Sequence, residues 1–355
     1  MNTLMTTLAC LALIVGESFA SDLRWTLSSG GGFDSNPAGY DQANMQALGW
    51  SKLDTRWSKD IESGSVKIAY NGIGYSYLPE SAWSGHRHGL SATYTSAVSS
   101  DFRYDLGTTV SGNWNHPDFT AHSYREIEGR ASTQSKYAGW NARTTLNLGV
   151  RLYPDSPEFD YRHVTLGASA QQSFVTRTSV GGGVEYATRL YTTRTIEDAF
   201  DGILNARSSR YRVNGFLGQG LTTTTGVKLS LYGENGNGRS RWRDDYWQVL
   251  DDPLATSGIG GRIQLSWLAP AGLTIRTYGE LDALDESYIA SDGAYARRDD
   301  DRLGAGISLQ SVLPWFTVIN STSFTVGVET ERNWSTDASY SYEQFSVMAG
   351  LMYAW

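Results

Sequence analysis

The chain has 355 residues, a formal net charge of −8 at pH 7 and a sequence pI near 5.2. Its single cysteine, Cys10, rules out a disulfide framework, and the acidic balance argues against a nucleic-acid partner. A mean hydropathy of −0.36, without any apolar run long enough to cross a bilayer, excludes membrane-spanning helices.

Residues 1–20 differ in composition from the rest of the chain. Leu8–Gly16 is a short apolar core, and Ser18-Phe19-Ala20 puts small residues where a signal peptidase cleaves. No Lys or Arg precedes the core, which departs from the usual secretory pattern. Cys10 lies inside the apolar run, and Thr7 stands where a lipidation signal needs leucine. We therefore expect a cleaved signal peptide at 1–20 and a mature chain at 21–355.

From residue 21 onward, apolar and polar residues alternate with a period of two. In 102–110, Phe102, Leu106 and Val110 fall on one face, and Arg103 and Asp105 fall on the other. The same alternation recurs at 178–191, 256–268 and 273–282. Nowhere does a helical stripe persist for three turns, so the sequence predicts an all-β protein.

Sixteen strands are predicted in chain order. Fourteen is the alternative count, because the alternation is poor near 44–57 and 161–178. The expected strands are 23–33, 44–57, 64–77, 87–96, 102–114, 123–134, 137–152, 161–172, 178–191, 208–218, 224–235, 256–268, 273–282, 302–312, 317–332 and 342–355.

The connections between these strands alternate in length. Even-numbered strands are followed by tight turns, and odd-numbered strands by longer connections. The expected turns are Ala97–Asp101, Ser135-Lys136, Gln219–Thr223, Ala269–Gly272 and Leu313–Phe316, and the longest connections are Thr192–Arg207, Gly236–Ala255 and Ala283–Asp301. Short turns on one side and long loops on the other are typical of bacterial membrane barrels.

A soluble sandwich would bury the apolar face, whereas a membrane barrel turns it toward lipid. The predicted strands reach ten residues or more, the length needed to cross a bilayer at a tilt. Aromatic residues lie near the ends of the apolar stripes, as in the girdles at membrane interfaces. These are Trp25, Trp57, Phe102, Trp267 and Trp315 at one end, and Tyr153, Tyr191 and Tyr211 at the other. The sequence therefore favours a transmembrane antiparallel up-and-down β-barrel over 21–355.

At the end of the chain, Phe345, Val347, Ala349, Leu351, Tyr353 and Trp355 occupy alternate positions on one face, and the last residue is aromatic. This pattern resembles the C-terminal signature by which Gram-negative outer-membrane β-barrels of the porin-like superfamily are recognised for assembly. The resemblance implies outer-membrane lipid, lipopolysaccharide and the barrel assembly machinery as partners.

A second stretch, Gly30-Gly31-Gly32-Phe33-Asp34-Ser35-Asn36-Pro37, is similar to the first hairpins of barrels linked to surface-lipoprotein or exopolysaccharide export. This likeness implies an export or assembly barrel that works with a separate periplasmic partner. We keep export as an alternative to a channel, together with a structural or adhesive barrel.

Charged residues opposite the apolar stripes are the candidate pore lining. A sixteen-strand barrel is too wide for side chains alone to fill, so an open pore is favoured over a plugged lumen. The candidates are Arg103, Arg143, Arg189, Arg212, Arg262, Arg276, Arg302, Glu185, Glu280 and Glu329. Their mixed field is typical of channels that select small hydrophilic solutes.

Two other groups of residues could carry chemistry. Acidic runs at Asp244-Asp245, Asp251-Asp252 and Asp299-Asp300-Asp301 are expected in outer loops, where like charges are usually solvated. His86-Arg87-His88 is also expected in an outer loop. No Ser–His pair at a fixed barrel spacing is found, so we expect neither an enzyme nor a cofactor or metal site.

Overall fold

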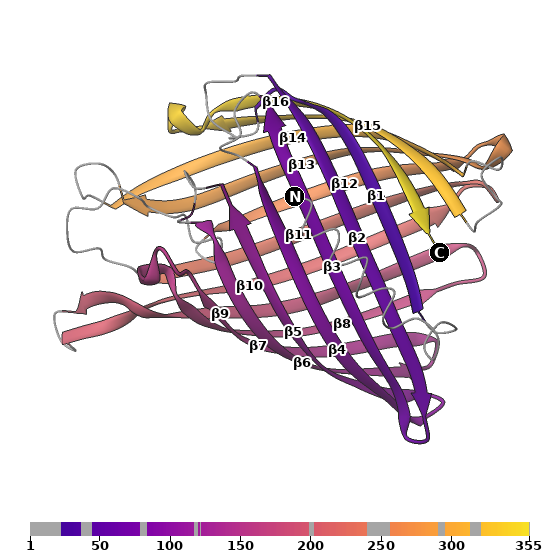
Figure 1. The fold of residues 1–355 in the computed structure, drawn as a ribbon, viewed down its shortest axis with the longest axis horizontal. Coiled ribbons are helices and arrows are strands. Elements are labelled where there is room, and N and C mark those ends of the chain that lie inside the picture. The colour runs from indigo at the N-terminus through magenta and orange to yellow at the C-terminus, as the bar shows by residue number, and fades with distance from the viewer. Residues whose placement is uncertain are drawn as a thin grey trace, which may run out of the picture.

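The computed structural model describes residues 23–36, 45–78, 84–116, 120, 122–198, 202–239, 256–289, 295–312 and 321–354. They form a closed antiparallel barrel of sixteen strands in which each strand pairs with its chain neighbours and β1 pairs with β16 (Figure 1). The strands are β1 (Leu23–Asp34), β2 (Gln46–Ile61), β3 (Gly64–Leu78), β4 (Gly85–Ser99), β5 (Phe102–Asn115), β6 (Tyr124–Tyr137), β7 (Trp140–Leu152), β8 (Tyr161–Ser173), β9 (Thr178–Asp198), β10 (Gly202–Gly220), β11 (Thr225–Arg239), β12 (Ser257–Leu268), β13 (Leu273–Ile289), β14 (Tyr295–Val312), β15 (Ser321–Ser335) and β16 (Tyr342–Ala354).

The all-β barrel and the count of sixteen are confirmed, and the alternative of fourteen strands is wrong. Both stretches with poor alternation are full strands, β2 and β8. Small and polar residues interrupt their apolar faces without interrupting the backbone pairing that defines a strand. Among the described residues, none forms a helix with the length and hydropathy to cross a bilayer.

Several predicted connections are shorter than expected. β9 and β10 extend through most of Thr192–Arg207, and β13 and β14 extend through most of Ala283–Asp301. Asp299-Asp300-Asp301 therefore lies on β14 and not in a loop, and His86 and His88 lie on β4. Polar residues in these hairpins still pair through their backbones beyond the end of the apolar stripe.

The turn between β6 and β7 also differs from the expected Ser135-Lys136. It consists of Ala138 and Gly139, whose φ angles are 48° and 84°. A two-residue hairpin turn with both φ values positive matches the twist of the flanking strands, and glycine adopts that conformation without strain. The expected turn at Leu313–Phe316 and most of Gly236–Ala255 lie outside the described residues.

The two ends of the barrel are different. The even-numbered strands β2, β4, β6, β8, β10 and β12 are followed by at most four residues before the next strand begins. The start of β1 and the end of β16 lie at the same end as these turns, because Thr26 pairs with Ala354. The longer connections, such as 116–123 and 153–160, lie at the opposite end.

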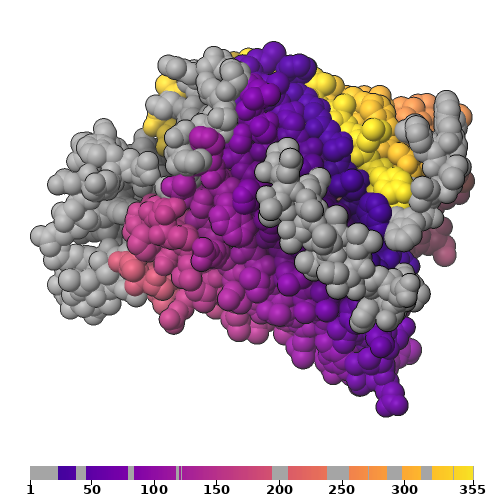
Figure 2. Space-filling view, viewed as in Figure 1, coloured from indigo at the N-terminus to yellow at the C-terminus, as the bar shows by residue number. Residues whose placement is uncertain are grey.

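The two faces of the wall differ in chemistry. On one face, large apolar side chains such as Leu106, Ile127 and Val213 are half or more exposed. On the other, Tyr232 of β11 donates a hydrogen bond to Asp282 of β13 (Oη–Oδ1, 2.8 Å), across Gly260 of β12. Side chains two strands apart converge in this way only on the concave side of a curved sheet. The polar face is therefore the inner face and the apolar face the outer one, of which Figure 2 shows the part over β1–β5.

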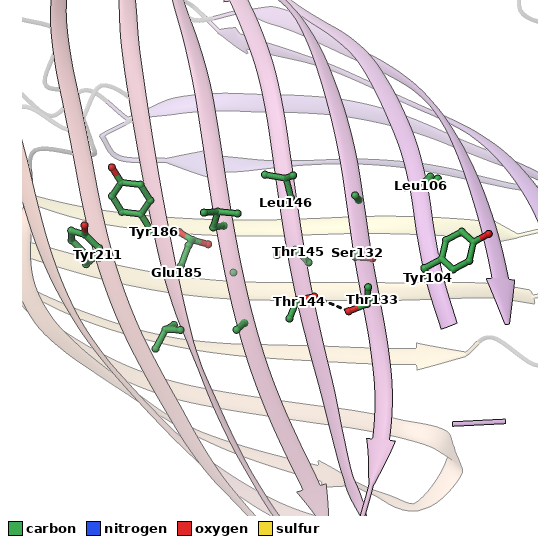
Figure 3. Close-up of a pocket in the computed structure, with 15 residues that line it drawn as sticks. Tyr104, Leu106, Ser132, Thr133, Thr144, Thr145, Leu146, Glu185, Tyr186 and Tyr211 are labelled. Carbon is green, nitrogen blue, oxygen red and sulfur yellow. Dashed lines mark hydrogen bonds between the residues drawn. The ribbon is translucent and has the colours of Figure 1, made fainter. Parts of the chain in front are cut away.

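The outer face carries an open groove of about 690 Å³ over β5–β10. Tyr104 lies at one end of it, and Tyr186 and Tyr211 lie at the other (Figure 3). Between them are small side chains, including Thr133 and Thr144, whose hydroxyl oxygens are 2.7 Å apart and hydrogen-bonded.

Candidate functional site: the inner wall of the barrel

Strand register places all ten candidate pore-lining residues on the inner face. The register links them in rows, such as Glu185–Arg212–Glu234 and Arg262–Glu280, around the closed sheet. The ten are Arg103, Arg143, Arg189, Arg212, Arg262, Arg276, Arg302, Glu185, Glu280 and Glu329. They come from eight different strands, so charge is spread around the wall and is not gathered at one point.

One group of ion pairs spans β9, β10 and β11. Arg210 lies 3.4 Å from Glu185 and 3.5 Å from Glu234, and Arg212 lies 3.7 Å from Glu234 (N–O distances). The side chain of Glu234 is 7% exposed, whereas that of Arg212 is 36% exposed. The Glu234 carboxylate is therefore buried against the wall, and Arg212 covers it on the side of the lumen.

A second group lies on β12–β14. Arg262 is 3.5 Å from Glu280, and its guanidinium lies 3.7 Å from the centre of the Tyr278 ring. A Cβ at Gly304 would approach Glu280 to 2.9 Å, and one at Gly306 would approach Tyr278 to 2.5 Å. These glycines let the charged and aromatic side chains lie flat against the wall, which leaves room in the centre of the barrel.

A third group joins β4 to β7. Asp105 accepts hydrogen bonds from Thr95 (2.7 Å) and Ser132 (3.0 Å), and its carboxylate is 3.9 Å from Arg143. Arg103, two residues from Asp105, is exposed and forms no ion pair with a described residue, and the same is true of Arg276 on β13. Arg276 is therefore a candidate without a carboxylate at ion-pair distance among the described residues, whereas Arg103 shares the field of Asp105 with Arg143.

At the end with the longer connections, aromatic side chains pack inside the mouth. Tyr161 and Tyr191 are 4% and 6% exposed and lie in contact with Tyr153 from the connection after β7. The prediction that Tyr153 and Tyr191 belong to an outer girdle is therefore wrong. Tyr191 follows the outward-facing Leu190, so strand alternation turns it inward, where Tyr161 shields it from water.

Arginines complete this mouth cluster. Arg151 lies over the ring of Tyr124 (4.0 Å) and forms an ion pair with Glu126 (2.8 Å), and Arg189 lies over Tyr161 (4.6 Å). Arginine is therefore held here by aromatic faces as well as by carboxylates, in cation–π contacts.

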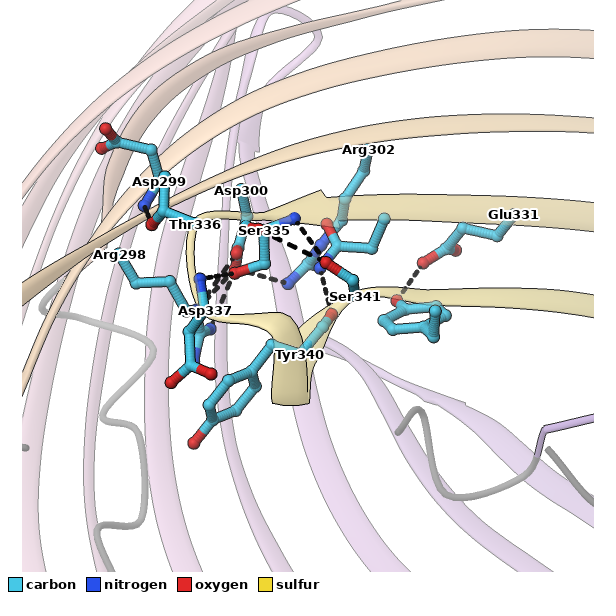
Figure 4. Close-up of polar contacts among 12 residues, drawn as sticks. Arg298, Asp299, Asp300, Arg302, Glu331, Ser335, Thr336, Asp337, Tyr340 and Ser341 are labelled. Carbon is cyan, nitrogen blue, oxygen red and sulfur yellow. Dashed lines mark hydrogen bonds and ion pairs between the residues drawn. The ribbon is translucent and has the colours of Figure 1, made fainter. Parts of the chain in front are cut away.

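A buried ion pair lies on β14 near the end of the barrel that carries the longer connections (Figure 4). Arg298 and Asp300, on the inner face of β14, are 2.9 Å apart, with side chains 3% and 0% exposed. The guanidinium lies 3.7 Å from the centre of the Tyr340 ring in the connection before β16, and Arg302 is 3.9 Å from the same carboxylate. The pair therefore fastens this connection to the wall.

Sequence alternation did not identify Glu234, Arg298 or Asp300. Glu234 pairs with Arg212 and lies on the polar face of the predicted strand 224–235. Extending the alternation of that strand to its polar face would have identified it. Arg298 and Asp300 were missed because their segment was assigned to a loop, where parity has no meaning. Among the described residues, no group of three His, Cys, Asp or Glu side chains is arranged to hold a metal ion.

The histidines lie on both faces. His163, on the inner face of β8, is between Glu128 (3.2 Å) and Glu126 (3.7 Å). His86 and His88 of β4 face outward, where both rings lie against Trp114 and His88 Nδ1 is 2.8 Å from the Tyr70 hydroxyl.

The C-terminal strand has the predicted alternation. Phe345, Val347, Leu351 and Tyr353 all face outward on β16, and the ring of Tyr353 lies 5.3 Å from that of Trp25 on β1. This contact is at the seam where the barrel closes. Trp355 lies outside the described residues.

No family model and no curated protein matches the sequence. The fold is nevertheless similar to that of Pseudomonas aeruginosa OccK2 (OpdF), with 12% identity, 95% of this chain and 99% of that chain covered, and a TM-score of 0.52. The same channel in complex with glucuronate gives 13% identity, 95% and 99% coverage, and a TM-score of 0.54. Acinetobacter baumannii OccAB3 gives 8% identity, 94% and 99% coverage, and 0.52. The closed sixteen-strand barrel of this chain is thus similar in fold to these outer-membrane channels of Gram-negative bacteria.

Proposed function

We propose that the chain is a channel in the outer membrane of a Gram-negative bacterium, through which small hydrophilic solutes pass. The observation that carries this proposal is the closed sixteen-strand barrel with a charged inner face. Barrels of this size leave an aqueous channel that side chains alone do not fill. A cavity of about 820 Å³ on the inner side of the wall supports the proposal. It is lined in part by Arg56, Arg87, Asp54 and Glu126.

The orientation follows from the difference between the two ends. Bacterial outer-membrane barrels have short turns on the periplasmic side and longer loops outside. The end with the Ala138-Gly139 turn, the start of β1 and the end of β16 would face the periplasm. The mouth cluster around Tyr161, and the Arg298–Asp300 pair, would then lie at the cell surface.

Small anions are the solutes that the inner wall fits best. Arg103 and Arg276 are exposed on the inner face, and neither is within ion-pair distance of a described carboxylate, so their positive charge raises the local concentration of anions. OccK2, whose fold is similar, has been crystallised with glucuronate. Glucuronate is an anionic sugar acid and so belongs to the class of small anions. We assign no catalytic role to the histidines, because His86 and His88 lie against Trp114 on the outer face.

Planar-bilayer recording of the refolded protein tests the proposal. We expect a steady conductance, and a reversal potential under a salt gradient that shifts toward cations in Arg103→Glu/Arg276→Glu. The substitutions Arg103→Lys and Arg276→Lys separate charge from shape, and we expect them to keep the wild-type selectivity. A folded protein that conducts no ions, or a charge reversal without any shift, would contradict the proposal.

A further inference from the structure

The groove on the outer face is apolar and lies where membrane lipid would cover it. One row across it contains Ala131 of β6, Leu146 of β7, Leu166 of β8 and Tyr186 of β9, which face one another in register. Ala131 in this row, with Thr133, Thr144 and Ala168 in the next, leaves a depression between larger side chains. The groove of about 690 Å³ is therefore an elongated apolar depression on a lipid-facing surface.

Arginines follow the groove at the end of the strands that carries the longer connections. Arg162 of β8 and Arg207 of β10 both pair with Leu190 of β9, so the two lie in one row on the outer face. With strands about 4.8 Å apart, their Cα atoms are about 10 Å apart. Arg125 of β6 lies in the next row, opposite Leu152. Arg125, Arg162 and Arg207 are all exposed.

The groove runs across the strands, and the two arginines border it over β8–β10 on the side of the longer connections. Arg207 is four residues from Tyr211, and it donates hydrogen bonds to the Tyr186 hydroxyl (3.1 Å) and to Thr188 Oγ1 (3.2 Å). Arg162 is four residues from Leu166 on the same face of β8. Two arginines therefore lie along the outer side of a groove whose lining is mainly apolar.

This arrangement is amphipathic in the same direction as a membrane lipid. An arginine facing lipid is costly near the bilayer midplane and nearly free at the interface. Guanidinium groups bind phosphate through paired charge-assisted hydrogen bonds. In the proposed orientation the arginine end lies in the outer leaflet, where the phosphate-bearing lipid is lipopolysaccharide.

We propose that the outer face of β5–β10 binds one lipopolysaccharide molecule, with phosphate on Arg162 and Arg207 and an acyl chain in the groove. This inference rests on the proposed membrane location and orientation. It does not depend on conductance, because the site and the lumen are on opposite faces of the wall.

The test measures retention of purified rough lipopolysaccharide by the detergent-solubilised barrel. We expect the wild type to retain the lipid through gel filtration, and Arg162→Gln/Arg207→Gln to bind it about tenfold or more weakly. The matched control is Arg332→Gln, an outward-facing arginine on β15 near the same end of the barrel, which should bind like the wild type. Heat-modifiable migration on gels verifies that each variant is folded.

Two further arms separate the headgroup from the chain. Dephosphorylated lipopolysaccharide should bind as weakly as the double variant, and millimolar inorganic phosphate should not displace the intact lipid. Ala131→Trp fills the groove without changing charge, and we expect it to weaken retention.

Three results would overturn the proposal. The first is equal retention by Arg162→Gln/Arg207→Gln and Arg332→Gln. The second is displacement by inorganic phosphate alone, which would indicate a simple anion site. The third is a dimer that Ala131→Trp dissociates while lipid retention stays unchanged, which would assign the groove to a contact between two copies. Conductance in phosphatidylcholine bilayers reports on the channel separately, so failure of one proposal is distinguishable from failure of the other.

Discussion

Two arginine–carboxylate pairs near the same end of the barrel have the same N–O distance and opposite surroundings. Arg298 and Asp300, on the inner face of β14, are 2.9 Å apart and buried, with side chains 3% and 0% exposed. Arg332 and Glu343, on the outer face of β15 and β16, are also 2.9 Å apart, with side chains 53% and 69% exposed. Distance alone therefore does not tell which pair matters, because the cost of leaving a charge unpaired depends on its access to water.

The same contrast extends to the two faces of the wall. Inner-face arginines such as Arg210 and Arg262 have carboxylate partners, and they occur along the whole length of the strands. The outer-face arginines Arg125, Arg162, Arg207 and Arg332 all lie toward the end with the longer connections. The position of an arginine thus reflects the medium that its side chain meets.

The largest effect is expected from Asp300→Asn. The change removes the buried carboxylate 2.9 Å from Arg298, and breaking a buried pair in this way costs about 3–5 kcal/mol. The matched change Glu343→Gln on the exposed pair should cost less than about 1 kcal/mol. Urea unfolding of the refolded barrel in vesicles measures both. Equal losses for the two variants would mean that burial does not decide the strength of these pairs.

A smaller effect is expected from placing a charge on the outer face. Ile263 faces outward on β12 and is 55% exposed, whereas its neighbour Gln264 faces inward. Near the midplane, Ile263→Arg should cost about 2–4 kcal/mol, because the arginine meets lipid. Gln264→Arg should be tolerated, because water and carboxylates are available inside. The assignment of faces is refuted if Gln264→Arg is the more destabilising of the two.

The smallest effect is expected at the seam between β1 and β16. Tyr353→Ala removes the contact with Trp25, and an aromatic pair contributes about 0.5–1.5 kcal/mol beyond its buried area. Ser346, on the inner face of the same strand, supplies the control Ser346→Ala. We also expect slower insertion for Tyr353→Ala, measured by the rate at which the folded band appears on gels. Identical insertion rates for both variants would mean that the outward-facing side chains of β16 do not contribute to assembly.

Much of this architecture was predictable from the sequence, because a membrane barrel imposes a strict period of two. The parity of Arg103, Arg262 and Glu280 alone put them on the polar face, and the structure places them on the inner wall. Strand ends were predicted less well. In β9, β10, β13 and β14 the apolar alternation stops before the backbone pairing does. The buried Arg298–Asp300 pair was missed for that reason.

The mouth cluster illustrates a second limit. Tyr191 was assigned to an outer girdle because it is aromatic and near a strand end. Its burial depends on Tyr153, in the β7–β8 connection, and on Tyr161, at the start of β8. Such contacts between distant segments leave no period in the sequence. The groove on the outer face was also invisible, because it needs the register of six strands.

Cysteine accessibility along β5 tests most directly the central claim, that the polar face lines a water-filled channel. Thr109 and Ser111 border the inner cavity, and Thr108 and Val110 face outward. Each is replaced singly by cysteine in a chain without Cys10 and reconstituted in vesicles. We predict that a membrane-impermeant maleimide reacts at Thr109→Cys and Ser111→Cys, and that a lipid-soluble quencher reaches only probes at Thr108→Cys and Val110→Cys. Inner positions that do not react, or equal reaction at all four, would contradict the account.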